Sequence, residues 1–157
     1  MAWKLELSDL QLDTDSLMSI EWSIGESEQV VITDYRNEDT DECLKIETVY
    51  LVSAASESDP DPLTYDDLQD ALSSGDEISY AVESYTYAQL WANGTRYAHE
   101  SFDTAIMGES VYSDPREALN AARKRAERRS DLLAHGHSDR YLNATRDDLI
   151  GTIPVGL

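Results

Sequence analysis

The chain has 157 residues, and its 32 acidic against 12 basic side chains give a formal net charge of −20. Hydrophobic residues make up 41% of the chain, which is too large a share for a disordered acidic polypeptide. No apolar run approaches the roughly 18 residues that a membrane-spanning helix needs, so the composition favours one folded domain without a helical membrane anchor.

The N-terminal part of the chain consists mainly of predicted strands. Alternating apolar and polar residues predict a strand over 3–12. The same pattern predicts a hairpin formed by 17–24 and 28–35, which turns at Gly25. Residues 43–54 are rich in β-branched side chains and end in a nearly continuous apolar run, as is typical of a central strand.

A short helix and a second hairpin are expected next. Thr64 and Asp67 resemble a capping box, and Gly75 suits the stop of that helix. Further on, Asn93-Gly94 suits a type I′ turn, because both positions of that turn require a positive φ. The strands predicted around this turn cover residues 78–91, 95–102 and 106–112.

The clearest predicted element is a long helix over 116–134. Asp114 is a good N-cap, Pro115 suits the first helical position, and Gly136 suits the stop. Residues 137–157 are predicted to be extended and to form an interaction tail.

Strands that outnumber two helices predict an α+β fold. We expect a mostly antiparallel sheet, either sandwich-like or with helices on one face, with one short helix and one long C-terminal helix. The expected domain covers residues 1–136, and residues 78–134 form a strand–strand–(strand)–helix unit within it. This unit is loosely similar in layout to double-stranded RNA-binding and three-stranded DNA-binding modules.

The acidic surplus indicates the solvent for which the protein is built. Asp outnumbers Glu, and only three of the twelve basic residues are Lys. Such a chain repels itself in dilute buffer, whereas molar salt shortens the Debye length to about 3 Å and screens that repulsion. The composition resembles that of cytoplasmic proteins of extreme halophiles, or of their viruses. The alternative is an acidic mimic of DNA or RNA, but the acidic residues are spread along the chain instead of forming one block. We therefore expect a cytoplasmic or virion protein with hydrated cations at its surface.

The C-terminal third is electrostatically distinct from the rest of the chain. Residues 1–113 carry 4 basic and 25 acidic side chains, a net −21, whereas residues 114–157 carry 8 basic and 7 acidic ones, a net +1. The basic residues can contact phosphates or the acidic surface of the same chain or a neighbour. The candidate nucleic-acid contacts are Arg96, Arg116, Lys124, Arg125, Arg128 and Arg129.

A histidine-rich sequence follows the predicted helix. His135, His137 and Asp139 form an H-x-H-x-D pattern that resembles the metal motif of the metallo-β-lactamase-like hydrolases. In that family two His and an Asp help to hold a two-zinc site, and the motif continues with His, where this chain has Arg140. The resemblance implies a small metal-dependent hydrolase. The alternative is that the imidazoles simply lie at a helix C-terminus, where the dipole favours their positive charge.

The last five residues carry no charge. Ile153, Val155 and Leu157 fall on one side of an extended segment, which can complete an edge of its own sheet or add a strand to a partner. We therefore expect a non-enzymatic structural or assembly protein without a cofactor, which binds itself or a protein partner and no membrane. A neck, tail or accessory capsid subunit of a halophilic archaeal virus is one setting. The alternatives are a nucleic-acid-associated regulator that uses the basic helix 116–129 and a metal-dependent hydrolase at His135 and His137.

Overall fold

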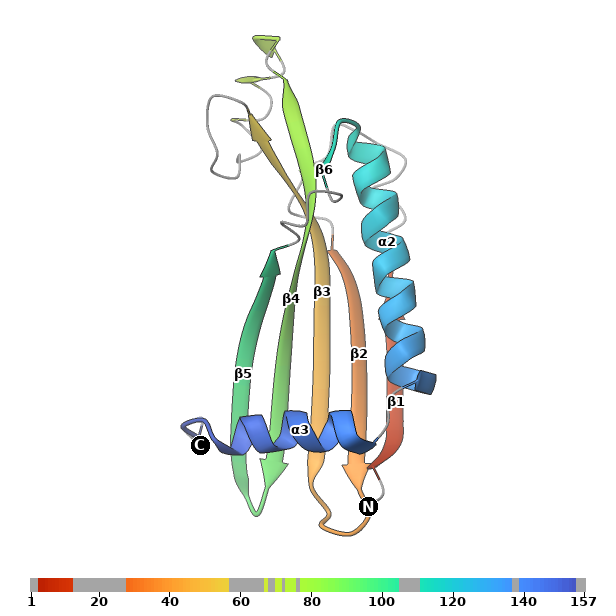
Figure 1. Ribbon diagram of the computed structural model, residues 1–157, viewed down its shortest axis with the longest axis vertical. Coiled ribbons are helices and arrows are strands. Elements are labelled where there is room, and N and C mark those ends of the chain that lie inside the picture. The colour runs from red at the N-terminus through yellow and green to blue at the C-terminus, as the bar shows by residue number, and fades with distance from the viewer. Residues whose placement is uncertain are drawn as a thin grey trace.

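An antiparallel sheet of five long strands forms the body of the protein (Figure 1). The computed structural model describes residues 3–12, 28–56, 77–104, 111–136 and 139–154, and positions 67, 70, 71 and 73–75. The strands follow one another in chain order across the sheet. They are β1 (Trp3–Gln11), β2 (Glu28–Asn37), β3 (Cys43–Ser56), β4 (Ile78–Ala92) and β5 (Thr95–Thr104), and a two-residue strand, β6 (Val111–Tyr112), also pairs with β4.

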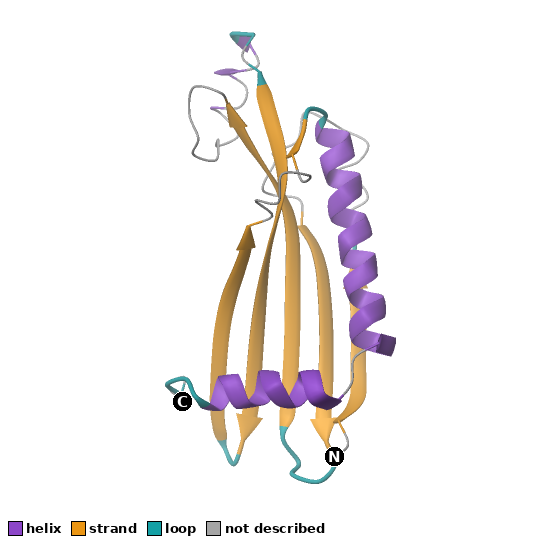
Figure 2. Ribbon diagram, viewed as in Figure 1, coloured by secondary structure: helices purple, strands orange, loops and turns teal. Residues whose placement is uncertain are grey.

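Two helices cover one face of this sheet. The first, α2 (Pro115–Asp131), runs along the strands and continues into a π-helical turn, η2 (Leu132–Gly136). The second, α3 (Asp139–Ile150), crosses the strands near one end of the sheet (Figure 2). The expected α+β fold with a mostly antiparallel sheet is therefore confirmed, in the form that places the helices on one face.

The local signals for α2 and for the β4–β5 turn act as expected. The Asp114 carboxylate accepts a hydrogen bond from the Arg116 backbone N–H at 2.9 Å, which satisfies one free donor of the first helical turn. Asn93 and Gly94 have φ values of 53° and 78°, as a type I′ turn requires. β3 is central, with β2 on one side and β4 on the other.

The expectation that residues 137–157 are extended is wrong for Asp139–Ile150, which form α3. Leu142 and Leu149 lie seven residues apart, so a helix places both on the side that faces the sheet, where they are buried. The segment thus contributes its apolar residues to the core of the domain and does not form an extended tail.

The core lies between the helices and the sheet. The side of α2 that faces the sheet is lined by Ala118, Ala122 and Ala126, each at most 1% exposed, and these small side chains let the helix approach the strands closely. α2 contacts β1, β2 and β3 as well as β4, so its packing extends beyond the expected unit over 78–134. The sheet residues of the larger core cluster are Val31, Tyr35, Leu44, Ile46, Ala88, Leu90 and Ala92.

Some expected elements lie outside the described residues. These include the strand over 17–24 with its turn at Gly25, and Thr64 of the short helix. Positions 67, 70, 71 and 73 are helical, and Gly75 has a φ of 78°, as expected for a residue that ends a helix. The expected strand over 106–112 is described only as β6, which pairs with β4.

Candidate interaction surfaces

α3 is attached to the sheet at three successive points along its length. Near its start, the Trp3 indole N–H of β1 donates to Asn143 Oδ1 at 2.8 Å. In its middle, Arg146 contacts Glu42 in the β2–β3 loop. Near its end, Leu149 packs into the core above β4 and β5. The helix therefore ties one edge of the sheet to the other.

The Glu42–Arg146 contact is the most buried ion pair among the described residues. Arg146 Nε and Nη2 donate to Glu42 Oε1 and Oε2, each at 3.0 Å, and the Thr40 hydroxyl also donates to Oε1 at 3.0 Å. The Glu42 side chain is 6% exposed and that of Arg146 is 32% exposed. The hydrogen bonds from Arg146 hold the pKa of Glu42 below its usual value, against the opposing effect of burial.

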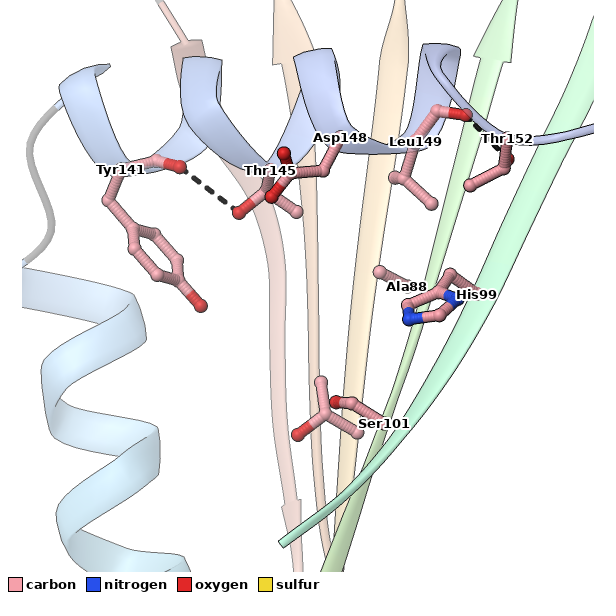
Figure 3. Close-up of a pocket in the computed structure, with 9 residues that line it drawn as sticks. Ala88, His99, Ser101, Tyr141, Thr145, Asp148, Leu149 and Thr152 are labelled. Carbon is pink, nitrogen blue, oxygen red and sulfur yellow. Dashed lines mark hydrogen bonds between the residues drawn. The ribbon is translucent and has the colours of Figure 1, made fainter.

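An open pocket of about 320 Å³ lies where α3 crosses β4 and β5 (Figure 3). This volume is at the lower end of the range for ligand pockets. His99 of β5 and Asp148 of α3 line it, and both side chains are solvent-exposed. Two of its hydroxyl groups already make hydrogen bonds within the protein: Thr145 donates to the Tyr141 carbonyl at 3.0 Å, and the Tyr141 hydroxyl accepts from Arg129. The pocket is therefore a crevice created by the crossing of α3 over β4 and β5.

The basic residues of α2 do not form one patch. Arg123 pairs with Glu127 through Nε and Oε1 at 3.2 Å, whereas Lys124 and Arg128 are exposed on the side of the helix that faces away from the sheet. Arg129 turns toward α3, where its Nη2 donates to the Tyr141 hydroxyl at 3.0 Å. Arg116 is exposed at the start of the helix, and Arg125 is half-buried.

Arg96, the remaining member of the candidate nucleic-acid set, lies on the opposite face of the sheet from α2. It pairs across strands with Trp91, which in turn pairs with Cys43, and residues in register share a face of the sheet. The next residue of β3, Leu44, faces the helices and is 1% exposed. The expected combination of Arg96 with the basic helix is therefore wrong, because side chains in a strand alternate between its two faces.

The described part of the histidine sequence forms no metal centre. His135 is exposed in η2, and His137 lies outside the described residues. Asp139 begins α3, and its Oδ1 accepts a hydrogen bond from the Trp3 backbone N–H at 3.3 Å. Within the described ranges no three His, Cys, Asp or Glu side chains are grouped closely enough to hold a metal ion.

The C-terminal segment begins beside the β5 edge of the sheet (Figure 1). After α3, the Thr152 hydroxyl and backbone N–H both donate to the Leu149 carbonyl, which closes the end of the helix. Ile153 is 89% exposed, whereas Val155 and Leu157 lie outside the described residues.

The face of the sheet opposite α2 and α3, here called the outer face, carries three cross-strand rows without a buried residue. They lie at the end of the sheet that holds the β4–β5 turn, and each contains one residue from each long strand. In strand order, the basic row consists of Lys4, Arg36, Cys43, Trp91 and Arg96. The middle row consists of Leu7, Asp34, Lys45, Gln89 and Ala98. The acidic row consists of Asp9, Ile32, Glu47, Tyr87 and Glu100.

Charge is separated along the outer face. The basic row holds three positive side chains and the acidic row three negative ones, while the middle row holds one of each sign. The four basic residues among the first 113 all lie in these rows: Lys4, Arg36, Lys45 and Arg96. Sequence patterns did not reveal this surface, because its signal is the register that joins residues distant in the chain.

One positive side chain of the basic row is already neutralised within the protein. Arg36 Nε contacts Glu6 Oε1 and Arg36 Nη1 contacts Asp41 Oδ1, each at 2.9 Å. Glu6 is placed for this contact by a bulge in β1, where the register shifts between Leu5 and Leu7. No ion pair with Lys4 or Arg96 occurs within the described part of the chain.

Comparison of the chain with protein-family models, with curated proteins and with solved structures finds no match. Within the described residues, none of the helices combines the length and the apolar character that crossing a bilayer requires. The geometry of the outer face, of α2 and of the C-terminal segment is therefore the basis on which a function can be inferred.

Proposed function

We propose that this protein is a non-enzymatic assembly protein that works in high salt and binds a protein partner through the outer face of its sheet. The observation that carries the proposal is the exposure of Leu7 and Trp91, at 48% and 40%, on an ordered part of that face. Both lie in rows that no described helix covers. The two side chains lie on β1 and β4, with charged residues between them, and large apolar side chains exposed on a sheet face that no described helix covers indicate an interaction site.

The C-terminal segment provides a second contact in this proposal. Ile153 is almost fully exposed, and no charged residue lies near it in the last five positions of a chain that is otherwise rich in charge. An apolar side chain exposed just after the last described helix, beside an edge strand, is suited to docking on a neighbouring molecule. Ile153, Val155 and Leu157 are the residues proposed for this contact.

The proposed setting is a salt-rich cytoplasm, or a virus particle that is assembled in such a cytoplasm. In the virus particle, the protein would be a neck, tail or accessory capsid subunit. The net charge of −20 supports this part of the proposal, because two such chains approach each other easily only when salt screens their repulsion.

Solution mass in molar KCl tests the proposal. We expect the full chain to have a mass above its monomer value of 17.6 kDa, and a Leu7→Ser/Trp91→Ser variant to have a lower mass than the full chain. Leu132→Ser is the matched control, because Leu132 is 45% exposed but belongs to η2 on the helix side of the sheet. A chain that ends at Thr152 tests the tail and keeps the buried Leu142 and Leu149 in place. A strict monomer would contradict the proposal.

A nucleic-acid-associated function is the second candidate. It is supported by the exposure of Lys124 and Arg128 on α2, with Arg116 at the start of the same helix. Binding of duplex DNA at several KCl concentrations tests it, because phosphate contacts weaken steeply with salt. Loss of binding in Lys124→Glu/Arg128→Glu would favour this function, whereas equal behaviour of the variant and the parent chain would exclude these two residues.

A further inference from the structure

We infer that the outer face binds a second copy of this chain about a two-fold axis that runs across the strands, so that the basic row of each copy meets the acidic row of the other. This inference rests on the proposed assembly function and names the partner and its orientation. The order of charges along the face, and the residues that each possible arrangement brings together, support it.

Two sheets that stack face to face lie about 10 Å apart, with their strands within about 30° of each other. A two-fold axis between them can run along the strands or across them. An axis along the strands places each row over the same row of the other copy, so basic meets basic and acidic meets acidic. An axis through the middle row and across the strands places the basic row over the acidic row. Charge therefore selects the second arrangement.

The second arrangement also keeps each strand over the same strand of the other copy. Along β1, Lys4 then faces Asp9 of the second copy, and along β5, Arg96 faces Glu100 of the second copy. Lys4 and Arg96 are the two positive side chains of the basic row that no ion pair of the described structure uses. Because the axis is two-fold, each of the two contacts forms twice.

The middle row brings Asp34 over Asp34 and Lys45 over Lys45 of the second copy, but these two residues are cross-strand neighbours of opposite sign, so this row adds no net charge to the contact. Two positions of the outer rows fit the arrangement better. Arg36, which Glu6 and Asp41 already neutralise, lies over the uncharged Ile32 of the second copy. Along β4, Trp91 lies over Tyr87 of the second copy, which pairs two aromatic side chains across the contact.

The size of the contact predicts a weak to moderate dimer. Five strands spaced about 4.8 Å apart and three rows spaced about 6.7 Å apart give a face of about 24 by 20 Å. Two such faces bury on the order of 1,000 Å², near the lower limit for a specific interface. A 30° rotation displaces the edge strands by about 5 Å along the strand direction, which Lys and Arg side chains can span.

Charge swaps on β5 test the inference by sedimentation equilibrium in molar KCl. Arg96 and Glu100 lie four residues apart on one strand, about 13 Å from each other, so they do not contact each other within one copy. Each single reversal turns two attractive contacts of the dimer into repulsive ones, and charges enclosed between two sheets are screened less by salt than exposed charges. We therefore expect Arg96→Glu and Glu100→Arg each to weaken self-association by about tenfold or more. The double variant Arg96→Glu/Glu100→Arg restores both contacts with reversed signs, so we expect it to associate to within about threefold of the parent chain.

Mixing the two single variants is the sharpest form of this test. In a mixed dimer, positions 96 and 100 are both acidic in the Arg96→Glu copy and both basic in the Glu100→Arg copy, so every contact between them is attractive. We therefore expect the mixture to associate more tightly than either variant alone. Arg128→Glu on the outer side of α2 is the control and leaves association unchanged, and thermal unfolding of each variant verifies that it is folded.

The outcomes separate this inference from the proposed function. An oligomer that Leu7→Ser/Trp91→Ser disrupts but that tolerates both single charge reversals would overturn the two-fold register and leave the assembly function in place. A double variant that associates no better than the single variants would overturn the register as well. A chain that remains monomeric at millimolar concentration would overturn both.

Discussion

Replacing Arg146 by Ala tests how strongly the β2–β3 loop holds α3. The change leaves the Glu42 carboxylate, with a side chain only 6% exposed, without its two guanidinium hydrogen bonds. Removing one partner of a buried ion pair costs about 3–5 kcal/mol. Arg146 itself is 32% exposed, so water can partly replace it, and we expect a loss of about 2–3 kcal/mol in the free energy of unfolding. For a domain of this size, that loss lowers the Tm by about 4–12 °C.

The pH dependence of the same variant gives an independent measure. The pKa of Glu42 is lowered in the folded protein, so its contribution to stability is present above the pKa of the unfolded chain and is lost as the pH falls through the folded value. The parent chain therefore loses this contribution in acid, whereas Arg146→Ala has already lost it. We expect the stability difference between the two proteins to shrink as the pH falls below about 4.5.

Urea unfolding in molar KCl, followed by circular dichroism, measures both effects. Arg123→Ala is the matched control, because it breaks an ion pair whose side chains are 38% and 45% exposed. Such a pair contributes about 0.5 kcal/mol or less, and molar salt screens it further. If Arg146→Ala destabilised the protein no more than Arg123→Ala, the reasoning about the buried carboxylate would be wrong.

Three further predictions concern the core and the solvent. Tyr35→Phe removes the hydrogen bond from the buried Tyr35 hydroxyl to the Leu133 carbonyl and should cost about 1–2 kcal/mol in urea unfolding. Burial raises the pKa of Tyr35, so the contribution of its hydroxyl to the stability of the parent chain should be present below about pH 10 and fall as the pH rises further. An equal loss of stability in Tyr35→Phe above that pH would show that Tyr35 is not the cause. Ala122→Leu should cost about 1–3 kcal/mol or more by forcing α2 away from the sheet, whereas Lys124→Leu on the outer side of the same helix should cost far less. Lowering KCl from molar to millimolar should lower the Tm, and a Tm independent of salt would contradict the role given to the net charge of −20.

Local patterns were sufficient to predict most of the sheet and the long helix. The alternation over 3–12, the turn at Asn93-Gly94 and the cap at Asp114 each reflect interactions between residues close in the chain, and each is present in the structure. The extended prediction for residues 137–157 failed for Asp139–Ile150 because α3 owes its place to distant partners. Its buried leucines need the sheet beneath them, and Arg146 needs a carboxylate that lies 104 residues away in the chain.

For the candidate sites, the difference between what local sequence predicts and what contacts between distant residues decide is larger still. The prediction that the protein is suited to high salt comes from composition alone, because net charge depends on which residues are present and not on where they lie. Whether basic residues act together depends on geometry: the helical repeat distributes those of α2 over several sides, and strand alternation places Arg96 on the other face of the sheet. The basic and acidic rows of the outer face exist only because antiparallel pairing brings one residue from each of five strands into register. Register is a property of the folded sheet, and so the surface from which we infer a two-fold dimer became visible only in the tertiary structure.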